Sequence, residues 1–552
     1  MPYGLAEWGD LFTDRQLETL NTLADLVGQV RERIEHDAAS AGFSRDATGL
    51  EGGGAGARAY SDAVAAYLGE TVSKLTSYHC TLGIWRANMT KSGRAFGRQA
   101  IPMVWDFPEC NPFAGAGGDW SGAVSDGAKV LGSLGRTAAG TSLQAAAQLG
   151  TGGRAPTVIS TDPPYYDNVA YADLADFFYV WLRRSLRGVF PALLSTLSTP
   201  KSEELVASAY RHGGKEAAES FFLKGMTEAM TALTPTAHPA YPVTIYYAFK
   251  QSETRADSGT SSTGWETFLQ AVLRAGFAIT GTWPVRTEQS KALKSSVGSL
   301  ASSIVLVCRP RGPDASTTFR REFREVLANE LPAAVAHLQR GNIAPVDLAQ
   351  AAIGPGMAVF SRYGKVMDLQ GQPLPVREAL ALINEVLDEC LAHQEGDFDR
   401  DTRWALAWYE QHGFADGDYG EADTLSKAKN TSVGGLQDAG VVTSSAGNVR
   451  LLAPIELPAD WHPDNDPRLT TWEIVHHLVK TLEEGGEADA GELVRALGSK
   501  SEVARELAYR LYSIAERKKR AQDALRYNGL VQSWPEIVRL ASEGPVTATE
   551  QA

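Results

Sequence analysis

The residues that most clearly indicate chemistry in this chain are the tetrapeptide Asp162–Tyr165, Asp-Pro-Pro-Tyr, which directly follows the apolar run 157–160. Two consecutive prolines lack the N–H groups that a strand or a helix interior needs, so the strand predicted over 157–160 must end at the motif. The next segment, 171–186, has the apolar and aromatic periodicity of a helix. Open α/β sheets bind ligands at the carboxyl ends of their strands, and the motif is therefore expected at a ligand-binding edge.

Asp-Pro-Pro-Tyr after a strand resembles motif IV of the S-adenosylmethionine-dependent amino-methyltransferases, which methylate exocyclic amines of adenine or cytosine. Such an amine is a poor nucleophile because its lone pair is delocalised into the ring. The carboxylate of Asp162 and the carbonyl of Pro163 can accept both amine hydrogens, and the rigid pair Pro163 and Pro164 holds these acceptors in place. Asp162 then stabilises positive charge on the amine more than it acts as a strong base. Tyr165 can stack on the flipped base, so its ring rather than its hydroxyl is expected to matter.

Residues beside the motif have two interpretations each. Tyr166 faces either the target base or the core, and Asp167 and Asn168 either line a base pocket or cap the helix that follows. Lys250 and Glu288 end two later strands on the presumed ligand side. Three aromatic residues at helical spacing are expected in the core rather than on a stacking platform: Phe177, Phe178 and Trp181.

The glycine-rich loop Asn111, Phe113, Gly115 and Gly117 matches the Phe-x-Gly-x-Gly pattern of an S-adenosylmethionine loop, whose glycines let the backbone approach the cofactor. Against this role, the stretch from this loop to Asp162 is too short for the two further strands that normally separate them. It also contains no apolar strand ending in Asp or Glu to hold the ribose hydroxyls. The alternative is a substrate loop, with the cofactor pocket completed by a missing segment or a partner chain.

Five segments together are similar to the DUF1156 family of adenine-specific DNA methylases, some of which are associated with phage defence: GRQAIPMVWDFPECNPF, STDPPYYDNVAYADLADFFYVWLRRSL, YPVTIYYAFKQSET, GWETFLQAVLRAGFAITGTWPVRTE and ASSIVLVCRPRG. The similarity extends from WGDLFTDRQL near the start to the region around residue 450. It implies DNA as the substrate, a class I fold and a seven-stranded sheet with an antiparallel last hairpin. Family members are usually longer, which implies that an amino-terminal half with an Asp-Pro-Phe-x-Gly-x-Gly loop is missing here.

The order of strands and helices independently predicts an α/β fold. Strands are expected at 100–107, 157–160, 241–251, 278–288 and 301–311, with helices between most of them. Strands alternating with helices and closing on two consecutive strands favour a mostly parallel sheet with an antiparallel edge. This Rossmann-like order agrees with the fold that the resemblance implies.

The chain is expected to divide into five segments. After Arg311 the pattern becomes helical, with a hairpin predicted over 358–374. Residues 400–453 then give three helices and two short strands, an order typical of a winged helix, which serves DNA contact or plain packing. The expected segments are a helical start (1–94), the methyltransferase core (95–312), a helical and hairpin connector (313–395), a winged-helix-like module (396–470) and a helical tail (471–552).

Composition limits the other functions. A net charge of −14 argues against nonspecific coating of nucleic acid without excluding a local basic groove. Four single cysteines, and a lone His79–Cys80 pair, predict neither a disulfide framework nor a metal site. The start lacks a signal peptide and no run of about 18 apolar residues occurs, so a cytoplasmic protein is expected. The alternatives to a DNA methyltransferase are a noncatalytic DNA-binding or scaffolding subunit, and an enzyme acting on RNA or, less readily with Asp162 in place of Asn, on protein glutamine.

Overall fold

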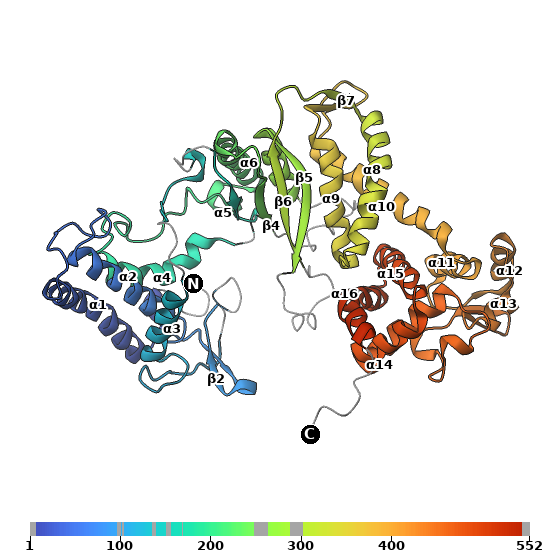
Figure 1. Ribbon diagram of the computed structural model, residues 1–552, viewed down its shortest axis with the longest axis horizontal. Coiled ribbons are helices and arrows are strands. Elements are labelled where there is room, and N and C mark those ends of the chain that lie inside the picture. Colours follow the sequence, from blue (N-terminus) through green and yellow to red (C-terminus); the bar gives the residue numbers. More distant parts are fainter. Residues whose placement is uncertain are drawn as a thin grey trace. The chain divides into compact units, whose positions relative to one another are not determined.

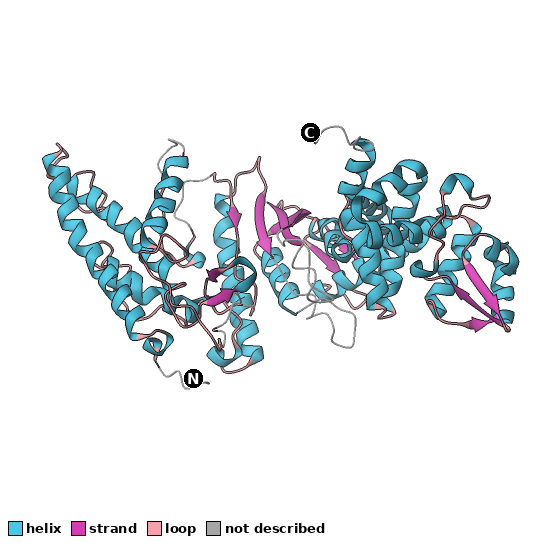
Figure 2. Cartoon of the chain, turned by 90° about the horizontal axis from the view of Figure 1, so that it is seen from below, coloured by secondary structure: helices cyan, strands magenta, loops and turns pink. Residues whose placement is uncertain are grey.

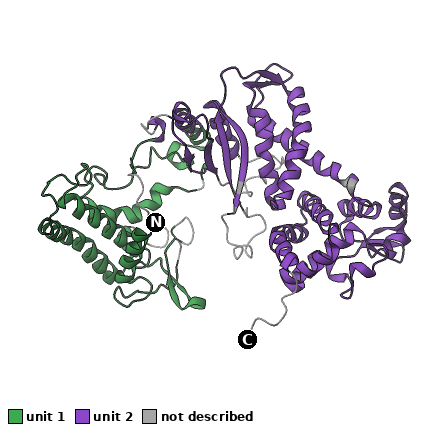
Figure 3. Ribbon diagram, in the orientation of Figure 1, with its two compact units in different colours: residues 1–146, 166–222 green, residues 147–165, 223–552 purple. Residues whose placement is uncertain are grey.

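The computed structural model describes residues 7–96, 101, 104–134, 140–150, 156–167, 169–247, 263–286 and 302–543 (Figure 1). Helices predominate over strands in this part of the chain (Figure 2). Two compact units are formed: unit 1 contains residues 1–146 and 166–222, and unit 2 contains residues 147–165 and 223–552 (Figure 3). The five finer domain boundaries stay predictions. Among the described residues, no helix has the length and apolar character that crossing a bilayer requires.

Unit 1 is built on four helices: α1 (Asp14–Ser40), α2 (Ala57–Thr76), α3 (Trp120–Ser133) and α4 (Tyr171–Leu186). The apolar positions of α1, α2 and α4 form one buried cluster that includes Leu20, Val72 and Trp181. Helices α2 and α4 approach closely at Gly69, where an added Cβ would lie only 2.6 Å from Leu186 Cγ. Glycine is therefore needed at this position. Thr13 caps α1 as its sequence position suggests, accepting a hydrogen bond from the Gln16 amide at 3.3 Å.

The remaining elements of unit 1 are short. Strands β1 (Ile84–Arg86) and β2 (Lys91–Gly93) pair in an antiparallel hairpin. Helix α5 is Ala209–His212, and α6 (Lys215–Leu233) begins in this unit. The strand expected at 100–107 is wrong for residues 104–107, which are irregular, and other parts of it lie outside the described residues. This stretch is solvent-facing, with Trp105 85% exposed, so the apolar run that suggested a strand has no sheet to pack in.

Unit 2 contains a mixed sheet in the order β3–β4–β6–β5, made of β3 (Ser160–Thr161), β4 (Val243–Tyr247), β5 (Phe277–Arg286) and β6 (Ser302–Pro310). Strand β3 runs parallel to β4, whereas β6 runs antiparallel to both β4 and β5. Three strands therefore share one direction and β6 opposes them, so that β5 and β6 pair in antiparallel fashion. A class I fold with seven strands stays a prediction, since the described sheet has four.

Helices cover this sheet and continue beyond it. Helix α7 (Thr263–Arg274) buries Phe268 and Leu269, and α9 (Pro345–Ser361) contacts β5 directly. The Ser361 hydroxyl accepts from the Ile279 amide at 2.8 Å, and a Cβ on Gly354 would lie 2.2 Å from Thr282 Oγ1. Flanking elements are α8 (Arg320–Arg340), α10 (Val376–His393) and the parallel pair β7 (Thr317–Phe319) and β8 (Lys365–Met367). The hairpin predicted over 358–374 is wrong for its first residues, which end α9, whereas in its second half β8 pairs with β7 and Met367 also forms an antiparallel bridge to Pro373.

The carboxyl-terminal region follows the predicted order. Three helices come first, and an antiparallel hairpin then joins a third strand in the order β10–β11–β9. The winged-helix interpretation itself stays a prediction. Its elements are α11 (Arg400–His412), β9 (Gly417–Asp418), α12 (Tyr419–Ala428), α13 (Val433–Asp438), β10 (Val442–Ser445) and β11 (Asn448–Leu451). The tail is helical as expected, with α14 (Thr471–Leu497), α15 (Lys500–Arg517) and α16 (Ala521–Glu543). Short 3-10 helices are η2 (Trp8–Leu11), η3 (Ala87–Met89), η4 (Ala147–Leu149), η5 (Thr234–Thr236), η8 (Gln394–Asp397), η9 (Pro454–Glu456) and η10 (Pro463–Asn465).

Candidate functional site

The Asp-Pro-Pro-Tyr motif begins where strand β3 ends. Ser160 and Thr161 pair with Thr244 and Ile245 of β4, and Asp162 is the next residue. The Thr244 amide donates to the carbonyl of Ile159 at 3.0 Å, which fixes the last residues before the motif. The motif therefore lies at the carboxyl end of a strand, as the proline pair predicts, although β3 is only two residues long.

Within the motif, a side-chain hydrogen bond links the two residues that could contact a substrate. The Tyr165 hydroxyl donates to Asp162 Oδ1 at 2.6 Å. Asp162 is exposed, Pro163 is buried and Tyr165 is half-buried. No described residue donates a hydrogen bond to Asp162 Oδ2, so this oxygen remains available as an acceptor toward solvent.

The ring of Tyr165 packs against a row of aromatic side chains in unit 2. It meets the Tyr247 ring edge-on, with 5.4 Å between centroids and 66° between planes. Tyr247 in turn stacks on Phe268 of α7 at 4.4 Å. Because Tyr247 and Phe268 are buried, the orientation of Tyr165 is set by the core of the sheet.

The residues that follow the motif do not form a second half of the site. Tyr166 is buried, and its ring meets that of Phe222 at 5.3 Å, which decides its two interpretations in favour of the core. Its backbone has a φ of +56°, in the left-handed region that costs free energy for a non-glycine residue. Asp167 is exposed and does not cap α4, whose N-cap is Ala170, so the capping alternative is wrong for it. Asn168 lies outside the described residues, as do Lys250 and Glu288.

Helix α4 is held by a charged network that the sequence analysis missed. The buried Asp176 carboxylate accepts from the Thr199 amide at 2.8 Å and from Lys201 Nζ at 2.7 Å. Burial raises the pKa of Asp176, but the bonds from Lys201 and Thr199 outweigh it and hold that pKa below its usual range. One acidic residue on the face of an aromatic helix is a signal for such a network, but its partners lie more than twenty residues away in the chain.

A second part of this network satisfies the first turn of α4. Glu204 accepts from the Ala172 amide at 3.0 Å, and Arg211 bridges Glu204 and Asp173 at 2.5 and 2.8 Å. Burial lowers the pKa of Arg211, but its bonds to Glu204, Asp173 and Tyr210 raise it overall above the usual range. These groups neutralise one another, and they stabilise the fold rather than offer a free charge.

The glycine-rich loop has its own internal hydrogen bonds. Asn111 Oδ1 accepts from the Phe113 amide at 2.9 Å, and the Asp119 carboxylate accepts from the amides of Gly115 at 3.0 Å and Gly122 at 2.7 Å. These backbone hydrogen bonds hold the pKa of Asp119 below its usual range, and the bond from Gly122 has the largest effect. Asp119 is the N-cap of α3, and the loop amide that would face a cofactor is already occupied.

The surroundings of the loop also differ from a cofactor loop. Among the described residues 104–110, no strand leads into Asn111. Phe113 is 74% exposed, and a Cβ on Gly115 would meet open space. His79 Nε2 lies 2.8 Å from the Gly118 carbonyl oxygen, which gives this buried histidine a structural role. The neighbouring Cys80 is buried, and burial raises the pKa of its thiol to about 11.

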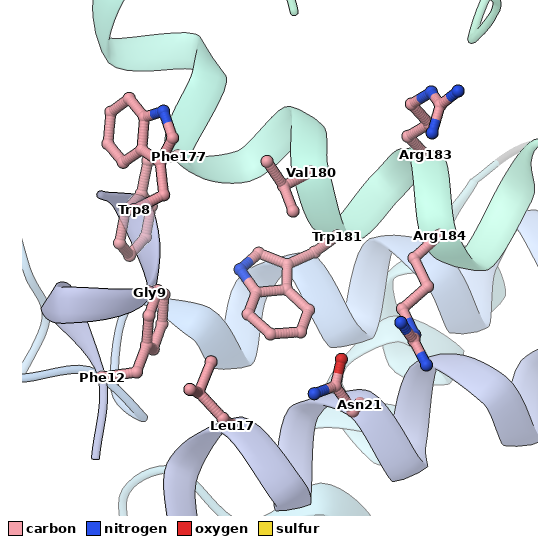
Figure 4. A pocket seen from close by; sticks show the side chains of 10 residues that line it. All are labelled: Trp8, Gly9, Phe12, Leu17, Asn21, Phe177, Val180, Trp181, Arg183 and Arg184. Atoms are coloured by element: carbon pink, nitrogen blue, oxygen red, sulfur yellow. The ribbon is translucent and has the colours of Figure 1, made fainter. Parts of the chain in front are cut away.

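A cavity of about 370 Å³ lies in unit 1, between the amino-terminal residues and α4 (Figure 4). The Phe12 ring stacks on Phe177 at 5.5 Å and meets Trp181 edge-on at 5.4 Å. Figure 4 shows the Trp181 indole turned toward Leu17, whereas Arg183 points away from the rings. Phe177 and Trp181 are thus buried core residues, as expected, that also line this apolar hollow.

Comparison with known proteins corrects the family assignment. Residues 399–552 match a domain of unknown function, DUF8807. The resemblance to the DUF1156 family is wrong, because neither that family nor a methyltransferase family matches the chain. Short similar segments with prolines, glycines and aromatic residues at strand ends are shared by unrelated α/β proteins and do not establish descent. No curated protein and no solved structure matches the chain.

Proposed function

We propose that this chain is a methyltransferase acting on an exocyclic amine of a nucleic-acid base, with adenine N6 of DNA as the favoured target. The observation that carries the proposal is the Asp-Pro-Pro-Tyr motif at the end of β3, with an exposed carboxylate oxygen and a supported tyrosine ring side by side. The β5–β6 hairpin adds support, because an antiparallel last hairpin is expected of this class of enzyme.

In this proposal the chain's own residues position and activate the amine. Asp162 Oδ2 and the Pro163 carbonyl accept its two hydrogens, which concentrates the lone pair on nitrogen and stabilises developing positive charge. The bond from Tyr165 to Oδ1 fixes the carboxylate plane, so that Oδ2 needs no reorientation during the reaction. The Tyr165 ring offers a face for the base, and the base must leave its stack to reach it.

The proposed methyl donor is S-adenosylmethionine, but the described residues do not form a complete pocket for it. The Gly115 amide is occupied by Asp119, and no described strand leads into the loop. The proposal includes a partner chain that completes the pocket and a cytoplasmic location, consistent with four free cysteines.

The same observation favours a second candidate, a noncatalytic nucleic-acid-binding or scaffolding subunit. A chain whose glycine loop is satisfied internally has lost one set of donors that a cofactor needs, and unpaired polar groups are costly on binding.

The two candidates are separated by incubating the purified full chain with tritiated S-adenosylmethionine and unmethylated plasmid DNA, with total RNA in a parallel reaction. Incorporation into DNA, followed by detection of N6-methyladenine in the digested nucleosides, is expected for the enzyme. Incorporation into RNA alone would show that the substrate is RNA and not DNA. No incorporation into either would contradict catalysis by this chain and favour the noncatalytic subunit.

A further inference from the structure

An exposed, basic and aromatic β-hairpin stands out in unit 1. It comprises residues 84–93, with β1 and β2 joined by the turn η3 (Figure 1). All three residues of β1 are exposed, and the largest apolar side chains, Trp85 and Met89, are 52% and 55% exposed. An isolated two-stranded hairpin buries little and is marginally stable by itself, so large apolar groups at its surface need another explanation than folding.

The charges of this hairpin are uncompensated. Arg86 and Lys91 stand directly opposite each other in the register, and like charges in this position destabilise a strand pair. Neither side chain forms an ion pair with any residue in the part of the chain that the structure describes. Residues 84–94 contain no acidic residue, although the whole chain carries a net charge of −14. Two adjacent, unpaired cations indicate a surface that binds an anion.

The base of the hairpin is anchored, which gives this surface a fixed position within unit 1. Arg94 Nε donates to the Tyr78 hydroxyl at 2.9 Å and lies over its ring. Cys110 Sγ donates to Ser92 Oγ at 3.2 Å, which joins the hairpin to the residue just before the glycine-rich loop.

Two acidic residues of the adjoining segment, Glu109 and Asp119, do not neutralise the hairpin. Glu109 is bound by Arg15 and by the Thr13 hydroxyl. Asp119 is occupied by the amides of Gly115 and Gly122. The cations of the hairpin therefore keep their charge for a ligand outside the chain.

We propose that hairpin 84–93 is a nucleic-acid-binding element, with Arg86 and Lys91 on the phosphate backbone and Trp85 and Met89 against the bases. A pair of cations and an exposed aromatic ring in one hairpin suit a polymer of phosphates and stackable bases, whereas a small anion would not use the apolar groups. The choice of nucleic acid rests on the proposed function, and the hairpin adds the surface through which the substrate is held.

The test is fluorescence anisotropy of the full chain with labelled single-stranded DNA, duplex DNA and RNA of one sequence, with no methyl donor present. The double variant Arg86→Gln/Lys91→Gln is expected to bind at least about ten-fold more weakly at low salt and to lower the slope of log affinity against log salt by about 2. Trp85→Ala is expected to weaken single-strand binding by about five-fold or more without changing that slope. The three nucleic acids identify which form is preferred.

Matched controls separate this surface from general charge. Lys129→Gln/Arg187→Gln removes two exposed cations from α3 and from the end of α4 in the same unit, and it is expected to leave both affinity and slope unchanged. Equal weakening by both double variants, or no weakening by the hairpin variant, would overturn the proposal. Binding to phosphatidylserine vesicles that the hairpin variant loses, with nucleic-acid binding intact, would overturn it in favour of a lipid surface. Because no methyl donor is present, this assay measures binding alone, so that failure of methyl transfer and failure of the hairpin give different results.

Discussion

The Asp-Pro-Pro-Tyr motif and the glycine-rich loop 111–119 are both short, rigid segments next to helices, yet their hydrogen bonds are distributed in opposite ways. In the motif, Tyr165 occupies one oxygen of Asp162 and leaves the other facing solvent. In the loop, Asp119 takes the Gly115 and Gly122 amides, so the backbone donors are used internally. A binding site needs acceptors or donors that have no hydrogen-bond partner within the fold, and glycine content alone does not provide them.

The largest expected effect tests the free acceptor of the motif. Asp162→Ala should reduce methyl transfer by about 10²- to 10⁴-fold, because both acceptor oxygens are lost. The exposed carboxylate contributes little to folding, so the melting temperature should change little. The measurement is the initial rate of tritium transfer alongside a thermal melt.

Asp167→Ala is the control, since it removes an exposed carboxylate five residues further along the chain. Equal losses in the two variants, or activity of Asp162→Ala within a few-fold of wild type, would remove the motif from the proposed mechanism.

The next effect tests the bonded oxygen of the motif. The sequence alone suggested that Tyr165→Phe would be tolerated, but the hydroxyl donates to Asp162, so its removal should cost about 0.5–1.5 kcal/mol, or two- to ten-fold in rate. Tyr165→Ala should lose about 1–3 kcal/mol more of transition-state stabilisation, because stacking on the base is also lost. Rates that are the same for Phe and wild type would show that the hydroxyl does not position Asp162, and equal rates for Phe and Ala would exclude stacking.

Local chemistry made part of the site predictable. The end of β3 and the exposure of Asp162 follow from two prolines, and the cap at Asp119 follows from an acidic residue just before a helical run. Whether the Tyr166 ring faces the core or a target base was not predictable from the sequence. Its direction depends on Phe222, more than fifty residues away, and on a left-handed backbone that tyrosine rarely adopts. The Asp176–Lys201 pair is likewise set by a tertiary contact. In the carboxyl-terminal region the helical periodicity was long enough to predict the elements, although not their role.

A smaller effect tests the packing of the loop, through two glycines that both have positive φ. At Gly118 (φ +87°) a Cβ would lie 2.9 Å from Cys110 Cβ, whereas at Gly115 (φ +67°) it would meet open space. Gly118→Ala should therefore lower the free energy of unfolding by about 2–3 kcal/mol, from strain and a steric clash together. Gly115→Ala should lower it by only about 1 kcal/mol, from strain alone. Urea denaturation measures both, and equal losses would show that the loop does not pack as described.

The smallest effect concerns pH, and it distinguishes an internally satisfied loop from one open to a ligand. Backbone donors hold the pKa of Asp119 below its usual value, so the carboxylate stabilises the folded loop at pH values above about 4, the ordinary range of an unfolded aspartate. That stabilisation is lost as the pH falls through the lowered pKa, because protonation removes the charge that the Gly115 and Gly122 amides contact. In wild type, the hydrogen-exchange protection factors of these two amides, which compare the observed rate with the intrinsic rate at the same pH, should fall at low pH. In Asp119→Asn they should already be lower at neutral pH and show no such step. Protection of the Gly115 amide that is the same in both proteins would mean that Asp119 does not occupy it, and the loop would again be free to bind a cofactor.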